Sequence, residues 1–577
     1  MRILKYLSAT VIAVTLLIGC TNLDENLYDQ VGSQNYYNTK MDVVRATFRP
    51  FEHAYWSIQS RHVLNELTAD QLITPTRDGW WDDAGRWRRL HYHEWTVEDG
   101  DAQTEWNGCF QGIMQANYVI EDLNTLSPER FGFSDEEFNN LKAQSQVLRA
   151  WFYIRLLDAF RNVPLAVSYN DISKNSAGQV EPKVVFDFIE SELKEAINLL
   201  KVKESFGGNV GNQGQWTKAG AAALLVRLYL NAEKYVGEDR YAECEKYAQD
   251  IVDGVYGPYK VDNRWDAPFD WDNETSDEVI FGFPGSKGYS FWHYQGDTYW
   301  WTVPSRARYY FNDAKAKAGD HNCKYAASPS YDLNGNLYNY SLGMPIQKFR
   351  KYPEDMRLKL YRNLGNNKRE GMFLFGSLEY KDDDGNTKRV QSPNSDYNLF
   401  IRDAVGQFKS LPEGQYPDNK KSDLTTGDHN SGWHFAKYPF YSDEDDKQME
   451  SDYVEIRLAE VIYSLAECKF RNGSVDDAAK LLNIVRKRNY PEDSWNRNLY
   501  VPEGSAVLTE GELLDEWGRE FFAESRRRID LIRFGKFNSG SWWDKSADAD
   551  NHTEIFAITR EVLNSNHNLV QNPGYGK

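Results

Sequence analysis

Two blocks of helical periodicity, separated by a long stretch without it, limit most strongly how this chain of 577 residues can fold. In the first block apolar residues recur at helical spacing over 102–124, 135–160, 184–202, 216–235 and 239–253. The second block holds an expected helix pair, 453–471 and 475–488, joined by a short turn. Such pairs are typical of tetratricopeptide-like scaffolds, although no clean repeat at that period is present. The sequence therefore predicts a mainly α fold with tetratricopeptide-like helix pairs as its scaffold.

Capping boxes mark where several of these helices should begin. Ser134, Ser474 and Thr509 each stand three residues before an acidic side chain. In a capping box the two side chains bond reciprocally to free backbone N–H groups of the first turn. We expect helices to start after all three residues, and the last one to continue from 510 to about 534.

The middle of the chain differs from both helical blocks in composition. It is rich in Gly, Pro, Tyr and Trp, and it carries the hairpin signals Asn334-Gly335 and Asp384-Gly385. Residues 278–281 are an expected strand. The chain is therefore expected to divide into an N-terminal helical scaffold (38–253), an irregular ligand-binding lobe with short strands (254–450) and a C-terminal helical scaffold (451–577). We expect the three parts to pack as one compact unit.

The N-terminus has the features of an export signal. Arg2 and Lys5 precede an apolar run that is too short to span a bilayer as a helix, and the run ends at Gly19-Cys20. This arrangement resembles a bacterial lipobox. It predicts a lipoprotein signal peptide at 1–19, lipidation of Cys20, and a lipid-anchored tether at 20–37; an ordinary secretory signal is the alternative.

Charge and cysteine spacing exclude several classes of protein. Lys+Arg number 67 against 86 Asp+Glu, a net charge of −19, which disfavours binding to nucleic acid phosphates. The four cysteines after Cys20 have no zinc-like spacing, so buried free thiols are expected. No cofactor is expected. The acidic run 443–446 could bind calcium, but a solvated loop is the favoured interpretation.

Aromatic residues make up 14% of the chain, and two segments concentrate them outside any helical pattern. The first is the Gly- and Asp-rich segment 74–87, which contains the candidates Trp80, Trp81 and Trp87. Asp70, Arg77, Asp78, Asp82 and Asp83 supply polar groups beside them. A sugar ring stacks its apolar face on indole and bonds its hydroxyls to such groups. The alternative is that one tryptophan of the pair anchors the loop in the core.

The second aromatic segment, 289–302, follows the expected strand. Its candidate ligand-contacting residues are Trp292, Tyr299, Trp300 and Trp301. A hydrophobic plug within the lobe is the alternative. Arg369 and Tyr397 are further polar candidates on loops.

Six segments in order along the chain resemble signatures of the SusD/RagB family of surface lipoproteins. They are 106–117, 143–165, 216–224, 276–281, 457–467 and 516–533. The sequence departs from the family pattern at Gln144, Gln146, Gly518 and Ser525, which are scaffold positions.

The resemblance implies a function as well as a fold. Members of this family bind oligosaccharides or polysaccharides at the cell outer membrane, and some handle peptides. Family members deliver the bound ligand to a SusC-like TonB-dependent transporter and are not enzymes. The resemblance places Trp81 at the family's platform tryptophan, and Asp70 and Arg77 at neighbouring polar ligands. It also implies a location facing the extracellular side.

Two other functions stay open from the sequence alone. A RagB-like peptide-binding lipoprotein would use the same scaffold. A surface glycoside hydrolase would need two carboxylates at a separation that sequence spacing does not reveal. Glu520, Glu524 and Arg528 are more simply interpreted as scaffold ion pairs on one helix face.

Overall fold

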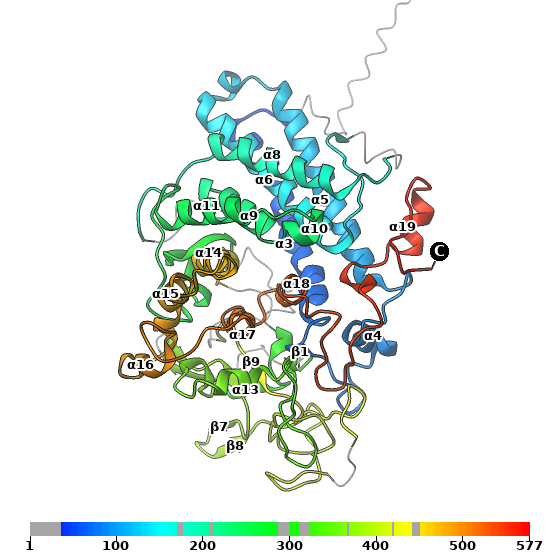
Figure 1. Ribbon diagram of the computed structural model, residues 1–577, viewed down its shortest axis with the longest axis vertical. Coiled ribbons are helices and arrows are strands. Elements are labelled where there is room, and N and C mark those ends of the chain that lie inside the picture. Colours follow the sequence, from blue (N-terminus) through cyan, green and yellow to red (C-terminus); the bar gives the residue numbers. More distant parts are fainter. Residues whose placement is uncertain are drawn as a thin grey trace, which may run out of the picture.

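The computed structural model describes residues 36–169, 177–207, 213–286, 300–311, 323–365, 368–417, 421–440 and 450–576. Its first half is an array of helices in which α3, α5, α6, α8, α9 and α11 each pack on the next in that order (Figure 1). The helices are α3 (Lys40–Glu66), α4 (Arg86–Tyr92), α5 (Gly100–Thr125), α6 (Asp135–Phe160), α8 (Pro182–Leu199), α9 (Lys218–Leu230), α10 (Ala232–Val236) and α11 (Tyr241–Val252). The predicted helices 102–124, 135–160, 184–202 and 239–253 are confirmed to within a few residues. The predicted helix 216–235 is divided at Asn231 into α9 and α10, and α3 and α4 were not predicted.

Local chemistry explains where these helices begin and how closely they pack. Thr39 and Ser134 form complete capping boxes at the starts of α3 and α6. Gly112 of α5 faces the ring of Phe152 on α6, and a Cβ at that position would lie 2.1 Å from the ring. Only glycine therefore permits the two long helices to approach this closely.

The C-terminal part begins with a strand instead of a helix. Residues 453–471 were predicted to be one helix, but Tyr453–Arg457 form β10, which pairs antiparallel with β2 (Val279–Phe283). Both strands are buried along their whole length, which suits their aromatic and β-branched side chains. Helix α14 (Leu458–Arg471) then follows and packs on α15 (Val475–Arg486) and on α11.

Two further helix predictions need correction. Ser474 is the N-cap of α15, but its side chain makes no capping hydrogen bond. The predicted helix from 510 to 534 is broken into α17 (Glu510–Glu520) and α18 (Arg527–Arg533), because Ala523 and Ser525 both adopt positive φ. Thr509 does cap α17, accepting a hydrogen bond from the N–H of Glu512. Two short helices complete this part, α16 (Trp495–Asn498) and α19 (Arg560–Ser565).

The lobe between the helical parts consists of loops, short strands and one short helix, α13 (Pro345–Arg350). Its strands are β3 (Ala326–Ala327), β4 (Arg362–Gly365), β5 (Lys368–Glu370), β6 (Phe373–Leu374), β7 (Glu379–Lys381), β8 (Thr387–Arg389) and β9 (His434–Phe435). Asp384-Gly385 connects β7 to β8 as predicted. β1 (Leu72–Ile73) pairs with β3 and so ties the N-terminal segment to the lobe.

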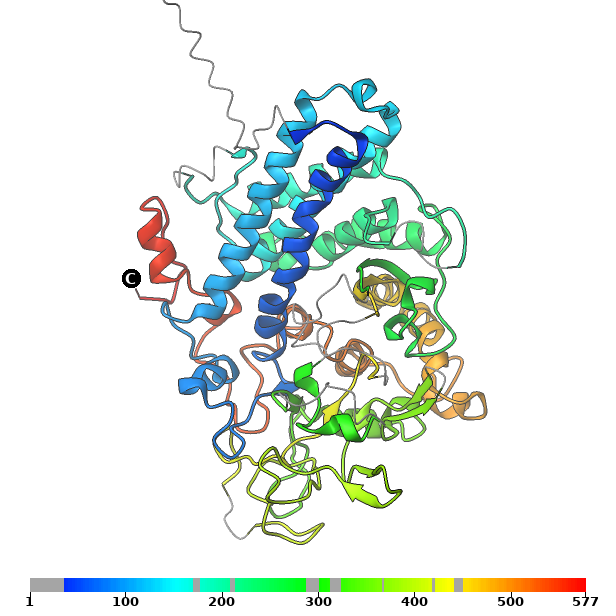
Figure 2. The ribbon, with the colours of Figure 1, turned by 180° about the vertical axis from the view of Figure 1, so that it is seen from behind.

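One large hydrophobic core joins all three parts, extending from Phe51 on α3 to Val562 on α19. The loops of the lobe lie at the opposite end of the molecule from the start of α3 (Figure 2). All four cysteines of the described chain are buried and free, as predicted. Within the described residues, no helix has the length and apolar character needed to cross a bilayer.

Candidate functional site

The two predicted aromatic segments meet in space. The ring centroids of Trp81 and Trp301 are 5.9 Å apart, with their planes tilted by 55°. Both indoles are half-buried, so each keeps an exposed part while it packs against the core. The structure therefore brings together one tryptophan from each segment, more than two hundred residues apart in sequence.

A buried lysine fixes the two indoles. Lys324 is 1% exposed, and its Nζ lies 3.7 Å from the ring centroid of Trp301 and 4.1 Å from that of Trp87. The ring centroid of Trp81 lies 6.0 Å from the same Nζ atom. Cation–π attraction in such a desolvated site is worth about 2 kcal/mol. Trp87 is thus a core residue, and its contact with Lys324 helps to hold the lysine beside the other two indoles.

The loop that carries Trp81 has a strained backbone. Asp78, Trp81, Asp83 and Ala84 all have φ between +40° and +63°. Non-glycine residues adopt this region rarely, at a cost of about 1–2 kcal/mol each. Paired backbone hydrogen bonds of 2.9 Å between Arg77 and Trp80 close the turn that begins the loop. Such strain persists where surrounding contacts impose it, and it is concentrated at ligand-binding sites.

This strain makes the loop's stability testable. Replacing Ala84 by glycine should raise the free energy of unfolding by about 1 kcal/mol, because glycine adopts positive φ without steric penalty. The matched control is Ala242→Gly on the exposed face of α11, which should lower stability. Urea unfolding of the three proteins gives the comparison. Equal destabilisation by both variants would contradict the strained geometry.

Asp70 does not lie at the edge of a ligand site. Its side chain is fully buried, with Oδ1 2.6 Å from Nε of Arg527 and Oδ2 3.0 Å from Nη2 of the same residue. Burial opposes ionisation of Asp70, but Arg527 and Lys348 hold its pKa well below the ordinary value. The prediction that Asp70 contacts ligand is therefore wrong for this structure: Asp70 is an internal ion-pair partner.

Arg77 is buried in the same way. Its Nη1 donates to the backbone oxygens of Asp428 and Ser431, which belong to a neighbouring loop of the lobe. Arg77 therefore holds the loop 74–87 on the lobe and does not face a ligand. Arg369 is also buried and donates to Ala436 O and Lys437 O, so it is not an edge residue either.

Of the predicted polar residues, Asp78 lies three positions before Trp81 and is half-buried. Asp78 accepts hydrogen bonds from Tyr397 Oη at 2.8 Å and from Lys409 Nζ at 2.9 Å. Trp80 is half-buried and packs edge-on against His429, with ring centroids 5.6 Å apart. Burial lowers the pKa of His429 to about 4, so the ring is neutral at pH 7. We call Trp80, Trp81, Trp301, Asp78 and Lys409 the aromatic site.

Sequence reasoning missed part of this set. Lys409 and His429 stand in loops with no motif around them, and only the fold brings them to residues 78–81. Tyr397 was a loop candidate and does lie beside Asp78. No short-range signal in the sequence identifies Lys409 or His429.

Several predicted residues lie outside the described part of the chain. They are Cys20, Trp292, Tyr299 and the acidic run 443–446. Trp300 begins a short 3₁₀ turn, Trp300–Thr302, next to Trp301. Among the residues that the structure describes, no group of three or more His, Cys, Asp or Glu is placed to hold a metal ion.

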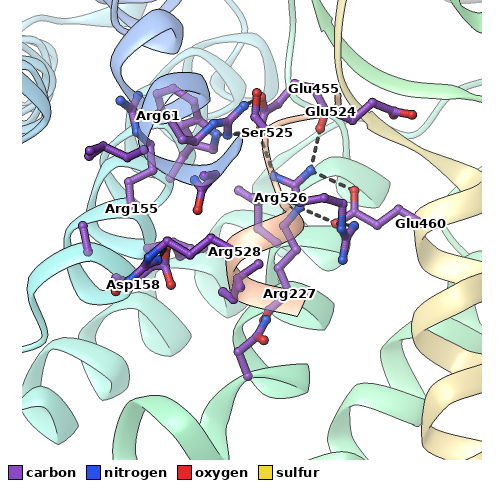
Figure 3. A pocket seen from close by; sticks show the side chains of 18 of the residues that line it. Arg61, Arg155, Asp158, Arg227, Glu455, Glu460, Glu524, Ser525, Arg526 and Arg528 are labelled. Carbon is purple, nitrogen blue, oxygen red and sulfur yellow. Dashed lines mark hydrogen bonds and ion pairs between the residues drawn. The ribbon is translucent and has the colours of Figure 1, made fainter. Parts of the chain in front are cut away.

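A second feature is an internal cavity of about 100 Å³ between the helical parts, lined with charged side chains (Figure 3). Glu455 accepts from Arg61 at 2.7 Å and from Arg227 at 2.7 Å. Burial alone would raise the pKa of Glu455, but Arg61 and Arg227 lower it to about 2. The carboxylate is thus ionised and paired, which suits a structural network better than an acid catalyst.

Glu520, Glu524 and Arg528 do form scaffold ion pairs, but not on one helix face as expected, because α17 ends at Glu520 and α18 begins at Arg527. Glu520 and Glu524 both bond to Arg457, while Arg528 pairs with Asp158 at 2.9 Å and not with either glutamate. These side chains connect β10, α6 and the α17–α18 segment, so the network holds the two helical parts together.

Glu66, which is fully buried beside Arg526, gives a pH-dependent prediction. Burial raises its pKa from 4.5 to about 8. At pH values between these two pKa values, Glu66 is protonated in the folded chain but ionised in the unfolded chain. The free energy of unfolding should therefore fall by about 1.4 kcal/mol per pH unit as pH rises. Urea unfolding from pH 5 to 8 should show a shallower decline for Glu66→Gln than for the unchanged protein. Parallel curves would contradict the raised pKa.

Comparison with known proteins identifies the class of protein that this fold and site define. The chain belongs to the SusD family: the family's profile matches residues 277–575, and a second profile, described as "Starch-binding associating with outer membrane", matches residues 27–230.

Individual relatives agree with this assignment. The chain is 25% identical over 548 residues to the starch-binding protein SusD of Bacteroides thetaiotaomicron, covering 89% of this chain and 84% of SusD. Its fold is similar to that of NanU from B. fragilis, at TM-score 0.66 and 18% identity, with 95% of this chain and all of NanU covered. It is also similar to a laminarin-binding SusD-like protein, at TM-score 0.64 and 18% identity over 93% of this chain and all of that protein.

Proposed function

We propose that this protein binds oligosaccharides or polysaccharides at the aromatic site. The observation that carries the proposal is the meeting of Trp81 and Trp301, which offer two tilted indole faces; Asp78, three residues before Trp81 in the same loop, holds Lys409 by an ion pair. Indole faces stack on sugar rings, and a carboxylate and an ammonium group bond to hydroxyls. Family membership and the starch- and laminarin-binding relatives support the same ligand class.

We further propose that the protein passes its ligand to a SusC-like TonB-dependent transporter. A lipid on Cys20 would anchor it to the cell outer membrane, facing the extracellular side. The lipobox-like sequence and the outer-membrane association in the family description support this location. In this role the protein is not an enzyme: it needs only moderate affinity, so that ligand can be released.

Affinity electrophoresis in gels that contain starch, laminarin, xylan or inulin tests the binding proposal. Retarded migration in at least one gel is the expected result, and that gel identifies the ligand. Migration unchanged in every gel, together with saturable binding of a tryptic peptide mixture, would favour the RagB-like peptide function. Release of new reducing ends from a retarding polysaccharide would instead favour a glycoside hydrolase.

Co-isolation from membranes tests the proposed partnership with a transporter. The lipid-anchored protein, extracted from outer membranes in mild detergent, should bring down a TonB-dependent transporter. Recovery of the protein alone under conditions that preserve other outer-membrane complexes would contradict delivery to such a partner.

A further inference from the structure

The exposed side of α5 carries two parallel stripes of side chains. Asn107, Gln111 and Gln115 follow one another at intervals of four residues, and Phe110, Met114 and Tyr118 do the same. Residues four apart lie on the same face of a helix. α5 packs on α3 and α6 through its other sides. One side of α5 therefore presents a row of carboxamides next to a row of apolar and aromatic groups.

The stripes line a groove. A hollow of about 200 Å³ lies between α5 and α19, and it includes Trp106, Phe110 and Leu569. A second hollow of about 440 Å³ lies between α5 and the start of α3, and Met114 lines both. Figure 2 shows α5 and α3 side by side, with α19 near the lower part of α5. We call the two neighbouring hollows together the α5 groove; the part of α5 that lines them, from Trp106 to Tyr118, is about 18 Å long at the helical rise per residue.

The wide end of the groove has acceptors that lack donors. Gln115 Oε1 is buried and has no hydrogen-bond partner in the described part of the chain. Pro50, inside α3, has no N–H, so the usual helical bond to the carbonyl of Ala46 cannot form. Ala46 and Pro50 both line the groove. Because an unpaired buried acceptor is unfavourable, this end suits a ligand rich in donors.

Tyrosine rings flank the same end. Tyr36, Tyr118 and Tyr169 are 41%, 45% and 38% exposed, and the centroids of Tyr118 and Tyr169 are 5.7 Å apart. Tyr169 is held to α5 by a 2.8 Å hydrogen bond from its N–H to the carboxylate of Glu121. Exposed rings that are held in place offer stacking surfaces with little loss of conformational entropy on binding.

We propose that the α5 groove is a second binding site, for a neutral oligosaccharide chain. Of the nearby charges, Arg49 is paired with Glu52 at 2.6 Å, whereas Asp122 and Glu121 accept hydrogen bonds from Tyr37 Oη and from Tyr169 N–H and keep their negative charge. Carboxylates, carboxamides and rings match the hydroxyls and faces of a neutral sugar and disfavour an anionic ligand. The narrow end also offers both kinds of contact, because Asn107, Gln111 and Asn566 line it together with Trp106 and Phe110.

The α5 groove is separate from the aromatic site. The groove follows α5 toward the start of α3, whereas the loop with Trp81 lies beyond the other end of α5, next to α4 (Figure 2). A long polysaccharide bound at both positions would gain avidity from the second contact. The inference does not require the aromatic site to be correct, because each site can be removed without the other.

Calorimetric titration with maltoheptaose, laminarihexaose, cellohexaose and xylohexaose tests the proposal. Three proteins are compared: the unchanged chain, Trp81→Ala, and the triple variant Gln111→Ala/Gln115→Ala/Tyr118→Ala. We expect about two molecules bound per unchanged chain for the oligosaccharide that binds, and one for each variant. Gln249→Ala/Tyr256→Ala, outside both sites, should still bind two. Thermal unfolding midpoints establish that each variant is folded.

Three results would overturn the inference. One is a single bound molecule on the unchanged chain that the triple variant still binds. Another is the absence of binding by Trp81→Ala to every oligosaccharide of the set. The third is a triple variant that keeps all saccharide binding but no longer co-isolates with a membrane protein, which would assign the groove to a protein partner. A single bound molecule on the unchanged chain that Trp81→Ala keeps and the triple variant loses would count against the aromatic site alone.

Discussion

Asp70→Asn should lower the free energy of unfolding by about 3–5 kcal/mol, because it leaves the buried guanidinium of Arg527 without its counter-charge. Both side chains are 1% exposed or less, so water cannot replace the lost partner. An asparagine amide also presents an N–H₂ group toward a cation that needs acceptors. Urea unfolding at pH 7 measures the effect.

Two controls separate this effect from a general sensitivity to charge removal. Asp82→Asn breaks an ion pair with Arg88 that is largely solvated, and should change stability by about 1 kcal/mol or less. The double variant Asp70→Asn/Arg527→Gln should cost less than the two single changes added together, because neither charge is then left alone. A loss below 1 kcal/mol for Asp70→Asn would mean that Asp70 is not an internal ion-pair partner.

Trp81→Ala should weaken glycan binding by roughly tenfold or more, since it removes a stacking surface and leaves Trp301 without its neighbour. Stability should change less than in Asp70→Asn, because Trp81 is only half-buried. Calorimetric titration with the polysaccharide fragment identified by electrophoresis gives the ratio of dissociation constants.

Trp56→Ala is the matched control for this change. Trp56 is 43% exposed on α3 and lies outside both proposed sites, so its removal should leave affinity within about twofold. Equal loss of affinity in the two variants would indicate that unfolding, and not the loss of a stacking face, reduces binding. Unchanged affinity in Trp81→Ala would remove this residue from the ligand site.

Local patterns predicted much of the scaffold but not α3. The bounds of α5 and α6 were predicted within two residues, from recurring apolar residues and, for α6, from the capping box at Ser134. β10 was mistaken for a helix because its five residues run directly into α14, and a short apolar run has no period of its own. Only pairing with β2, about 170 residues earlier, makes it a strand.

The break between α17 and α18 shows a different limit. Ala523 and Ser525 have no preference for positive φ, and the apolar pattern continues through them. The helix ends there because Glu520 and Glu524 are held by Arg457 on β10. Such tertiary ion pairs override local propensity and leave no mark in the sequence.

For the aromatic site, residue type was a better guide than position. Trp81 was predicted because its Gly- and Asp-rich loop has no regular period that would bury the indoles, and Trp301 because it belongs to an aromatic segment outside any helical pattern; the two rings do meet. Asp70 and Arg77 were predicted as polar contacts, yet both are buried, since a charge near a loop does not reveal whether it has a partner in the core. Asp78 was predicted as well, but its partner Lys409 is 331 residues away in sequence and was not.

A crystal structure of the protein with the bound oligosaccharide tests the central claim most directly. The account predicts a sugar ring stacked on the exposed face of Trp81 or Trp301, about 4 Å from the indole plane, with hydroxyls hydrogen-bonded to Asp78 or Lys409. A saccharide bound elsewhere on the chain, with both indole faces open to solvent, would contradict it.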